Sequence, residues 1–292
     1  MKSGFVNIVG NPNVGTSTLM NLLVGERISI ATFKAQTTRH RIMGIVNTPT
    51  MQVVYSDTPG VLKPGYKLQE QMLQFSESAL QDADVLLYVT DMVEKADKNA
   101  DFLAKVAAMQ VPVLLLVNKI DTSNQSELEQ TVAEWREVLP RAEVFPISAK
   151  ARFGVDQVVR RIEELLPEAP PYFDTDQLTD KPARFFVCEI IREKILLYYD
   201  KEVPYSVEVV VEQFKESDKS IHINAVIYCE RESQKGIIIG HHGVALKRVS
   251  SEARKDLERF FGKSIYLETF VKVDADWRQS QRAMKRYGYE LD

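Results

Sequence analysis

A glycine-rich segment near the N-terminus has residue types suited to binding phosphate. Gly10-Asn11-Pro12-Asn13-Val14-Gly15-Thr16-Ser17-Thr18 follows an apolar run and leads directly into a helical pattern. In a strand, glycine-rich turn and helix, backbone N–H groups and the helix dipole hold phosphates, and the Ser17 hydroxyl is placed to ligate a magnesium ion. The usual pattern G-x-x-x-x-G-K-[ST] has lysine where this chain has Thr16. Alone, the segment is a weak match, and an ordinary strand-to-helix turn explains it about equally well.

Two further polar segments each follow an apolar run. Asp57-Thr58-Pro59-Gly60 follows the run 52–55. Its aspartate can reach the ligand shell of a magnesium ion, and the N–H of Gly60 can contact a γ-phosphate. Asn118-Lys119-Ile120-Asp121 follows the run 113–117. The Asp121 carboxylate can accept from the N1–H and exocyclic amine of guanine, a donor pair that adenine lacks, while the stem of Lys119 packs along the base.

A fourth segment, Ser148-Ala149-Lys150, follows the next apolar run and would close the base pocket. Each segment also has a simple structural explanation, since Asp-Thr-Pro-Gly suits a turn and Asn-Lys-Ile-Asp suits a helix-capping loop. However, all four occur in order at the C-terminal ends of apolar runs, where open α/β sheets bind ligands. This order favours a guanine-nucleotide site. A dinucleotide-dependent oxidoreductase is excluded because residues 10–17 do not supply G-x-G-x-x-G.

The elements that must position these segments lie before residue 167. Short apolar runs alternate there with longer helical patterns, and runs of Val, Leu and Ile without strict alternation indicate strands buried on both faces. Such strands separated by helices predict an α/β domain with a mostly parallel, doubly wound sheet. The runs are 5–9, 52–55, 85–89, 113–117 and 144–147.

A proline-rich segment predicts the domain boundary. Pro167, Pro170, Pro171 and Pro182 fall within 167–183, which we interpret as an extended linker between domains 1–166 and 184–292. The second part predicts a small α+β domain with a three-stranded sheet. Its helical patterns are 184–199 and 244–261, and its alternating patterns are 206–214, 221–229 and 264–273.

Charge is unevenly distributed along the 292 residues. The chain has 37 Lys and Arg against 41 Asp and Glu, a formal net charge of −4, and is 45% hydrophobic, as is typical of folded globular proteins. Residues 231–292 hold 13 basic and 9 acidic residues and so carry +4, which leaves −8 on the rest. The C-terminal part is therefore the candidate for an anionic partner.

Cysteine usage and hydropathy indicate the compartment. Cys188 and Cys229 stand far apart among apolar residues, which suits reduced core thiols better than a disulfide or a metal site. The N-terminus lacks the apolar stretch of a signal peptide, and no apolar run approaches the roughly 18 to 20 residues that span a bilayer. We expect a soluble, cytoplasmic protein.

The basic part contains a G-x-x-G turn, residues 240–243, between an apolar helical run and a second helix. Its glycines would let a nucleic-acid backbone approach, and adjacent apolar residues would form a groove for single-stranded bases. A helix hairpin with a solvated basic face is the alternative. The candidate RNA-binding residues are Lys235, Gly236, Ile239, Gly240, His241, His242, Gly243, Lys247 and Arg248.

Two neighbouring features are ambiguous. His241 and His242 are expected to be loop residues rather than metal ligands, because no Cys or further His lies at ligand spacing. The tail from Trp277 to Tyr287 mixes aromatic and basic residues. It could line an RNA path, or it could form a helix that packs on the domain through its two end aromatics.

The nucleotide segments resemble those of the translation-factor-like GTPases, and Gln36-Thr37-Thr38-Arg39-His40-Arg41 narrows the resemblance to the Era family. The order helix, strand, strand, helix, G-x-x-G, helix, strand is similar to the prokaryotic, type II KH domain, and its place after a GTPase domain is the Era arrangement. The resemblance covers essentially the whole chain. It implies a Ras-like phosphate-loop GTPase domain followed by a KH domain.

The resemblance also implies a function. A GTP-dependent switch would bind GTP or GDP with Mg²⁺, bind the 3′-terminal region of small-subunit ribosomal RNA, and assist maturation of the small ribosomal subunit. Thr38, with Thr37 as neighbour, would complete a magnesium site with Ser17 and Asp57. We expect a monomer, and peripheral association with the inner membrane is left open.

A glutamine of the Ras kind, which orients the attacking water, is absent because Val61 follows Gly60. Catalysis would therefore have to come from other groups. Related GTPases with an asparagine at the position of Asn13 use a potassium ion near the phosphates. The predicted catalytic residues are therefore Asn13, Thr38 and Gly60.

Thr16 bears on whether GTP is hydrolysed. A lysine there would donate charge-assisted hydrogen bonds worth roughly 1.5 to 3 kcal/mol each, so its loss corresponds to about 10- to 100-fold in affinity. One alternative is thus an RNA-binding assembly scaffold that no longer hydrolyses GTP. Another is a GTPase that acts on protein or membrane partners and uses its KH fold for docking, against which the +4 balance and the G-x-x-G turn argue.

Overall fold

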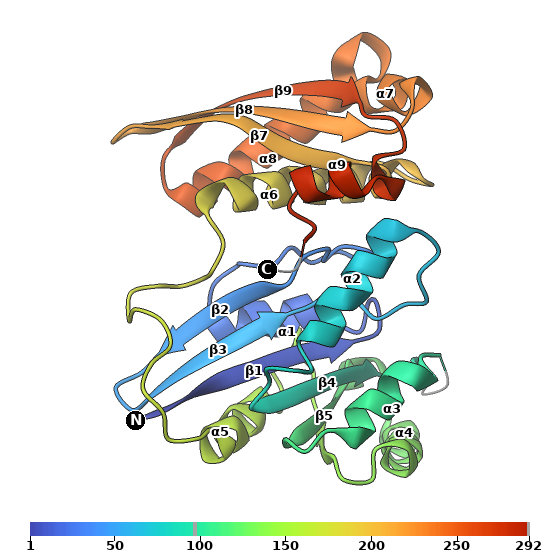
Figure 1. Ribbon diagram of the computed structural model, residues 1–292, viewed down its shortest axis with the longest axis vertical. Helices are drawn as coiled ribbons and strands as arrows, with labels where there is room; N and C mark the ends of the chain where they lie inside the picture. The colour runs from blue at the N-terminus through green and yellow to red at the C-terminus, as the bar shows by residue number, and fades with distance from the viewer. Residues whose placement is uncertain (96–97, 291–292) are drawn as a thin grey trace. The chain divides into compact units, whose positions relative to one another are not determined.

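The computed structural model describes residues 1–95 and 98–290, which form two compact units (Figure 1). The first comprises Met1–Gly65 and Gln69–Asp180, and the second comprises Lys181–Glu290 together with Tyr66–Leu68. Each unit is built on its own sheet.

A six-stranded sheet forms the centre of the first unit, in the order β2-β3-β1-β4-β5-β6. Its strands are β1 Lys2–Gly10, β2 Ile42–Asn47, β3 Met51–Asp57, β4 Val85–Asp91, β5 Val113–Asn118 and β6 Glu143–Pro146. All neighbouring pairs are parallel except β2 and β3, which are antiparallel. The predicted mostly parallel, doubly wound sheet is confirmed, with β2 as an edge strand that the apolar runs did not indicate.

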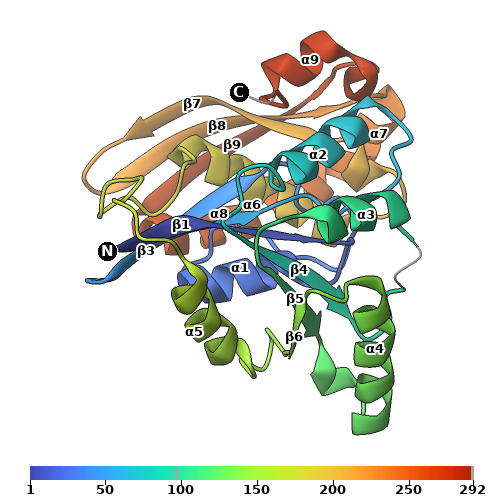
Figure 2. The same cartoon turned by 60° about the horizontal axis from the view of Figure 1, so that its bottom comes forward.

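Helices cover both faces of this sheet, with α1 and α5 on one face and α2 and α3 on the other (Figure 2). The helices are α1 Thr16–Val24, α2 Lys67–Ser78, α3 Ala100–Ala108, α4 Gln125–Val138 and α5 Val155–Leu165. Every residue of β4 is buried, which explains its unbroken apolar sequence. Trp135 of α4 packs with Tyr88 of β4 and Phe102 of α3 in the core of the second face.

The ends of the strands determine where the polar segments lie. β1 ends at Gly10, β3 at Asp57 and β5 at Asn118. Because these strands are parallel, the segments that follow them meet at the carboxyl edge of the sheet. β3 runs two residues beyond the expected end at Tyr55 and includes Asp57.

The segment 167–180 is hydrogen-bonded to the first unit along its length. Gln52 accepts from the backbone N–H groups of Tyr172 and Phe173, at 2.7 and 3.0 Å. Thr179 donates its hydroxyl to the carbonyl of Met43 in β2 at 2.6 Å. Backbone N–H groups and the Thr179 hydroxyl therefore anchor this extended segment to β3 and β2.

The second unit is a three-stranded sheet packed against helices. Its elements are α6 Ala183–Tyr198, β7 Glu208–Glu216, β8 Ser220–Cys229, α7 Glu232–Ile239, α8 Val244–Phe261, β9 Ser264–Val273 and α9 Gln281–Arg286. The sheet order is β7-β8-β9, with β7 antiparallel and β9 parallel to β8. The core gathers apolar residues of α6, α8 and the inner sheet face. This is the α+β arrangement that the alternating patterns predicted.

Cys188 and Cys229 are both free thiols. Burial raises the pKa of each, which lowers the fraction of reactive thiolate. In the part of the chain that the structure describes, no helix is both long and apolar enough to cross a membrane.

Candidate functional site

Three hydroxyl and carboxylate groups converge at the carboxyl edge of the first sheet. Ser17, the second residue of α1, donates its hydroxyl to Asp57 Oδ2 at 2.7 Å. Thr38, from the loop before β2, lies with its hydroxyl 2.8 Å from that of Ser17 and 3.5 Å from Asp57 Oδ2. The three residues predicted to hold magnesium thus form one cluster, although they come from separate elements. Oxygen ligands of this kind are those that Mg²⁺ prefers.

Asp57 has the properties of a carboxylate that needs a cation. It is fully buried, and its Oδ1 has no hydrogen-bond partner among the described residues. Burial raises the pKa of Asp57 to about 6, and hydrogen bonds from neighbouring hydroxyls, chiefly that of Ser17, act in the opposite direction. A divalent ion beside this carboxylate would favour its ionised form. The residues present therefore fit a magnesium site.

The second threonine of the pair faces elsewhere. Thr37 donates its hydroxyl to the carbonyl of Lys34 at 2.6 Å, and its oxygen lies 2.6 Å from the hydroxyl of Thr32. Thr37 therefore stabilises a local turn, whereas Thr38 reaches the Ser17–Asp57 cluster. This arrangement supports the choice of Thr38 over Thr37 as the magnesium ligand.

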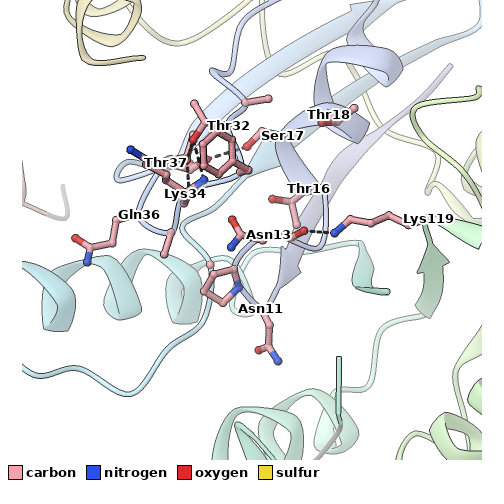
Figure 3. Close-up of a pocket in the computed structure, with 17 residues that line it drawn as sticks. Asn11, Asn13, Thr16, Ser17, Thr18, Thr32, Lys34, Gln36, Thr37 and Lys119 are labelled. Atoms are coloured by element: carbon pink, nitrogen blue, oxygen red, sulfur yellow. Dashed lines mark hydrogen bonds between the residues drawn. The ribbon is translucent and has the colours of Figure 1, made fainter. Parts of the chain in front are cut away.

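A cavity of about 300 Å³ lies beside the cluster, between the phosphate loop and the segment 31–38 (Figure 3). Thr16 lies on its wall, so no lysine projects from the phosphate loop at that position. Gly60 closes another part of the wall. A Cβ atom at Gly60 would lie 2.7 Å from Pro12 Cα, so only glycine permits this close approach. The lining residues are Asn11, Pro12, Asn13, Gly15, Thr16, Ser17, Thr18, Ala31, Thr32, Phe33, Lys34, Ala35, Gln36, Thr37, Thr38, Gly60 and Lys119.

The segments predicted to bind the base are tied to the phosphate loop. Asn118 donates its amide to the carbonyl of Val14 at 2.8 Å and accepts from the N–H of Ala149 at 3.0 Å. Ser148 donates its hydroxyl to Asp121 Oδ1 at 2.6 Å. A carboxylate oriented in this way can accept hydrogen bonds from a base edge.

Not all predicted nucleotide residues line the same cavity. Those that lie outside its wall are Gly10, Val14, Asp57, Asn118, Asp121, Ser148, Ala149 and Lys150. Gly10, Val14 and Asn118 hold the phosphate loop in place through hydrogen bonds. The carbonyl of Gly10 accepts from the N–H of Val61 at 2.9 Å, and the carbonyl of Val14 accepts from the Asn118 amide. The cavity is therefore lined by residues predicted to bind the phosphates, whereas Asp121, Ser148, Ala149 and Lys150, which were predicted to bind the base, lie outside its wall.

Several functional contacts were missed by sequence reasoning. Lys119 donates to the carbonyl of Asn13 and forms an ion pair with Asp91 at 2.6 Å. Asn11 is buried, donates to Glu94 at 2.9 Å and accepts from Asn99 at 2.6 Å. Asp91 ends β4 as Asn118 ends β5, so its strand-end position was the signal that could have found it.

The predicted RNA-binding residues gather around the turn between α7 and α8. Gly240 has a φ of 70°, and a Cβ atom there would lie 2.6 Å from the Cβ of Ala245. His241 and His242 are exposed within the turn, and Lys247 and Arg248 are exposed on the first turns of α8. The guanidinium of Arg248 also lies 4.1 Å from the ring of Tyr198.

Two exposed apolar residues beside the turn were not among the predicted ones. Ile237 on α7 and Val244 at the start of α8 are 52% and 68% exposed. Exposed aliphatic residues that flank a glycine turn could provide the apolar surface of a base-binding groove. The apolar run 236–239 was the signal, but the sequence could not tell which of its members face solvent.

The tail packs on the second unit. Trp277 is fully buried and donates its indole N–H to the carbonyl of Ser206 at 2.8 Å. Tyr287 lies 5.5 Å from the ring of Trp277 and 5.6 Å from that of Tyr228 in β8. Trp277 is enclosed by protein. This arrangement favours the packed helix over the RNA path as the interpretation of the tail.

A doubly wound sheet that gathers a phosphate loop, an oxygen cluster and a base-side loop at one edge places the first unit among the Ras-like GTPases. The model of a 50S ribosome-binding GTPase family matches residues 5–119, and a KH domain model matches residues 202–278.

Full-length relatives then identify the family. GTPase Era of Clostridium kluyveri is 42% identical over 292 residues, which cover 99% of this chain and 100% of that protein. GTPase Era of Carboxydothermus hydrogenoformans is 44% identical over 291 residues, with 99% and 98% covered. The chain belongs to the Era family of GTPases.

Two solved structures have the same fold over the full length of both chains. One is a variant of Aquifex aeolicus Era bound to GDP·AlF4⁻, with a TM-score of 0.95 and 36% identity. The other is Era in complex with MgGDPNP and nucleotides 1506–1542 of 16S ribosomal RNA, with the same TM-score and identity. The Ras-like domain and the KH domain predicted from the sequence are thereby confirmed.

Proposed function

We propose that this chain is a GTP-binding and GTP-hydrolysing switch whose KH domain binds small-subunit ribosomal RNA near its 3′ end and assists assembly of the small subunit. The convergence of Ser17, Thr38 and Asp57 beside the phosphate-side cavity carries the nucleotide part of this proposal. The Era relative with nucleotides 1506–1542 of 16S ribosomal RNA supports the RNA part.

The nucleotide would be held mainly by backbone groups. N–H groups of the phosphate loop and the N-terminus of α1 face the phosphates, and Asp121 accepts from the guanine edge. Magnesium, held by Ser17, Thr38 and Asp57, would neutralise charge on the β- and γ-phosphates. Thr38 and Gly60 stand on the two loops that would contact the γ-phosphate. Loss of that phosphate releases both loops. The change in these loops would make the conformation of the rest of the protein depend on whether GTP or GDP is bound.

Water activation must come from groups other than residue 61. Val61 is 2% exposed, and its N–H donates to the carbonyl of Gly10, so it contributes no polar side chain to the cavity. Asn13 lines the cavity, and we propose that its side chain helps to hold a potassium ion near the phosphates. Replacing potassium by sodium should then slow hydrolysis. An unchanged rate would remove this role from Asn13.

RNA would bind at the turn between α7 and α8. The glycine positions allow close approach of the RNA backbone, and Lys235, Lys247 and Arg248 add positive charge. Raising the salt concentration should therefore weaken binding of a small-subunit 3′-end RNA steeply by counterion release. A salt-insensitive interaction with a protein or a membrane would instead favour use of the KH fold for docking.

Thr16 supports a second candidate, an RNA-binding assembly scaffold that does not hydrolyse GTP. Its hydroxyl is short and uncharged, so transition-state charge on the phosphoryl oxygens would lack a cation from the loop. Titration of fluorescent GDP and a non-hydrolysable GTP analogue, with single-turnover hydrolysis, on this chain and on Thr16→Lys separates the two. Turnover in both chains supports the switch. Turnover only in Thr16→Lys supports the scaffold.

A further inference from the structure

Asn99 occupies the N-cap position of α3, but its side chain does not cap that helix. An asparagine at this position usually accepts a hydrogen bond from a backbone N–H of the first helical turn. Asn124, at the N-cap of α4, does so from the N–H of Glu127 at 3.1 Å. Asn99 forms no such capping hydrogen bond. Its side chain instead makes contacts outside its own helix.

The side-chain amide of Asn99 donates in two directions. It donates to the side-chain oxygen of Asn11 in the phosphate loop at 2.6 Å and to the backbone carbonyl of Val61 at 2.9 Å. Asn11 is 4% exposed, and its own amide donates to Glu94 at 2.9 Å. One amide group therefore joins the phosphate loop to the chain that follows Gly60.

Both backbone groups of Val61 are thereby held. Its N–H donates to the carbonyl of Gly10 at 2.9 Å, and its carbonyl accepts from Asn99. The preceding residue, Gly60, approaches the phosphate loop so closely that a Cβ atom there would lie 2.7 Å from Pro12 Cα. Because residue 61 is fixed by two hydrogen bonds, the position of Gly60 beside the phosphate loop is restrained as well.

We propose that Asn99 is a positioning residue that holds the segment after Gly60 against the phosphate loop and so places the N–H of Gly60 for the γ-phosphate. This inference rests on the proposed function, in which that N–H contacts the γ-phosphate of GTP. GDP lacks this phosphate, so its binding depends less on where Gly60 lies. Asn99 therefore raises the affinity for GTP relative to GDP, and it does so from outside the cavity wall.

Nucleotide titrations of full-length variants test this role. Dissociation constants for a fluorescent non-hydrolysable GTP analogue and for GDP are measured with magnesium on the given chain and on Asn99→Ala. The ratio of the two constants cancels a general loss of stability, which would affect both nucleotides alike. Asn99→Ala should weaken the GTP analogue by about 5- to 30-fold, as two lost hydrogen bonds allow, and GDP by less than about 2-fold.

Two further variants separate positioning from helix capping and from charge. Asn124→Ala removes a side chain that does cap its helix, and it should leave the ratio unchanged. Asn99→Asp keeps a residue type favoured at the N-cap, but an ionised carboxylate cannot donate. It should therefore reduce the relative affinity for the GTP analogue, as Asn99→Ala does.

Three results would overturn the role of Asn99. They are an unchanged or raised relative affinity for the GTP analogue in Asn99→Ala, a loss confined to Asn99→Asp, which would reflect the added charge, and an equal loss in Asn124→Ala. In each of these cases GDP still binds, so the proposed function stands. Absence of GDP binding in every chain would instead contradict the proposed function, and with it this role.

Discussion

Two adjacent threonines with the same side chain have different neighbours, and this difference is testable. Thr38 contacts the Ser17–Asp57 cluster, whereas Thr37 contacts Thr32 and Lys34. We expect Thr38→Ala to raise the magnesium concentration needed for binding of a GTP analogue by about 10-fold or more. Thr37→Ala should leave that requirement unchanged, even where it weakens nucleotide binding through the local turn. Magnesium titrations at fixed nucleotide measure both, and equal shifts would contradict the assignment.

The buried carboxylate of Asp57 should make the metal-free protein sensitive to pH. Its pKa is about 6 in the folded chain, against 3.8 for an exposed aspartate. The unfolded chain therefore loses this proton first as the pH rises. The free energy of unfolding then falls between about pH 4 and 7, by up to about 3 kcal/mol.

Asp57→Asn should remove this dependence and stabilise the nucleotide- and magnesium-free protein at pH 7.5 by about 1–3 kcal/mol, while raising the magnesium concentration needed for binding of a GTP analogue. Denaturant unfolding in the presence of a chelator measures the effect. Asp121→Asn, at an exposed position, serves as the matched control. Identical pH profiles for Asp57→Asn and the given chain would contradict the account.

At the residue scale, the sequence predicted the polar residues that the ends of parallel strands bring together. Ser17, Asp57 and Asn118 follow or end parallel strands, so their meeting at one edge follows from topology. The partners of Asn11 and Lys119 could not be predicted in the same way. Glu94 lies far along the chain from Asn11 and belongs to no pattern, so only the folded chain brings the two together. Asp91 stands at a strand end, but nothing in the sequence pairs it with Lys119.

Helix α6 contains charged residues that the structure buries. Arg192 forms an ion pair with Glu189 at 2.6 Å, and their side chains are only 2% and 7% exposed. Arg259 and Asp256 on α8 have the same i,i+3 spacing, but the arginine is 77% exposed. The two pairs therefore differ in the burial of the arginine, and Asp256 also has a second cation partner, Lys194.

We expect Arg192→Met to reduce the free energy of unfolding of the second unit by about 3–5 kcal/mol, because it leaves the Glu189 carboxylate buried without its cation. Arg259→Met should cost at most about 1 kcal/mol. Denaturant unfolding compares them, with both variants made in chains that carry Trp135→Phe, so that the fluorescence reports Trp277 alone. Similar losses would show that burial does not determine the contribution of these pairs.

At the element scale, strongly patterned segments were predictable and weakly patterned ones were not. The helical pattern 244–261 coincides with α8, because its apolar residues recur on one face and Gly262 follows it. β2 was missed, since Gly44 and Asn47 interrupt its apolar character and β3 is the one named strand that it pairs with among the described residues. The buried charges of α6 contradict a simple amphipathic pattern, so its degree of burial could not be read from periodicity.

For the whole molecule, a nucleotide unit and a KH unit in one chain imply linkage between their ligands. If GTP favours the state that binds RNA, RNA must favour GTP by the same factor. We expect a small-subunit 3′-end RNA to bind more tightly with a non-hydrolysable GTP analogue than with GDP, by about 5- to 150-fold. Fluorescence anisotropy at constant salt measures this. Equal affinities in both nucleotide states and without nucleotide would contradict the switch.

The order of the two domains and the net +4 of residues 231–292 were evident from sequence, because both depend on residue types and their order. The role of the tail from Trp277 to Tyr287 was not evident from the sequence, since aromatic and basic residues suit an RNA path and a packed helix equally. Burial of Trp277, which depends on the shape of the unit it packs against, was needed to choose between them.

The central claim is that guanine nucleotides bind at the carboxyl edge of the first sheet. The most direct test is whether Asp121→Asn changes the base that the chain prefers. Xanthine has an oxygen where guanine has the exocyclic amine. The amide introduced by Asp121→Asn can donate to that oxygen and still accept from N1–H. Titration with fluorescent GDP and XDP should show the given chain preferring GDP by about 100-fold or more, and Asp121→Asn preferring XDP. GDP affinity that is unaffected by this substitution would contradict the account.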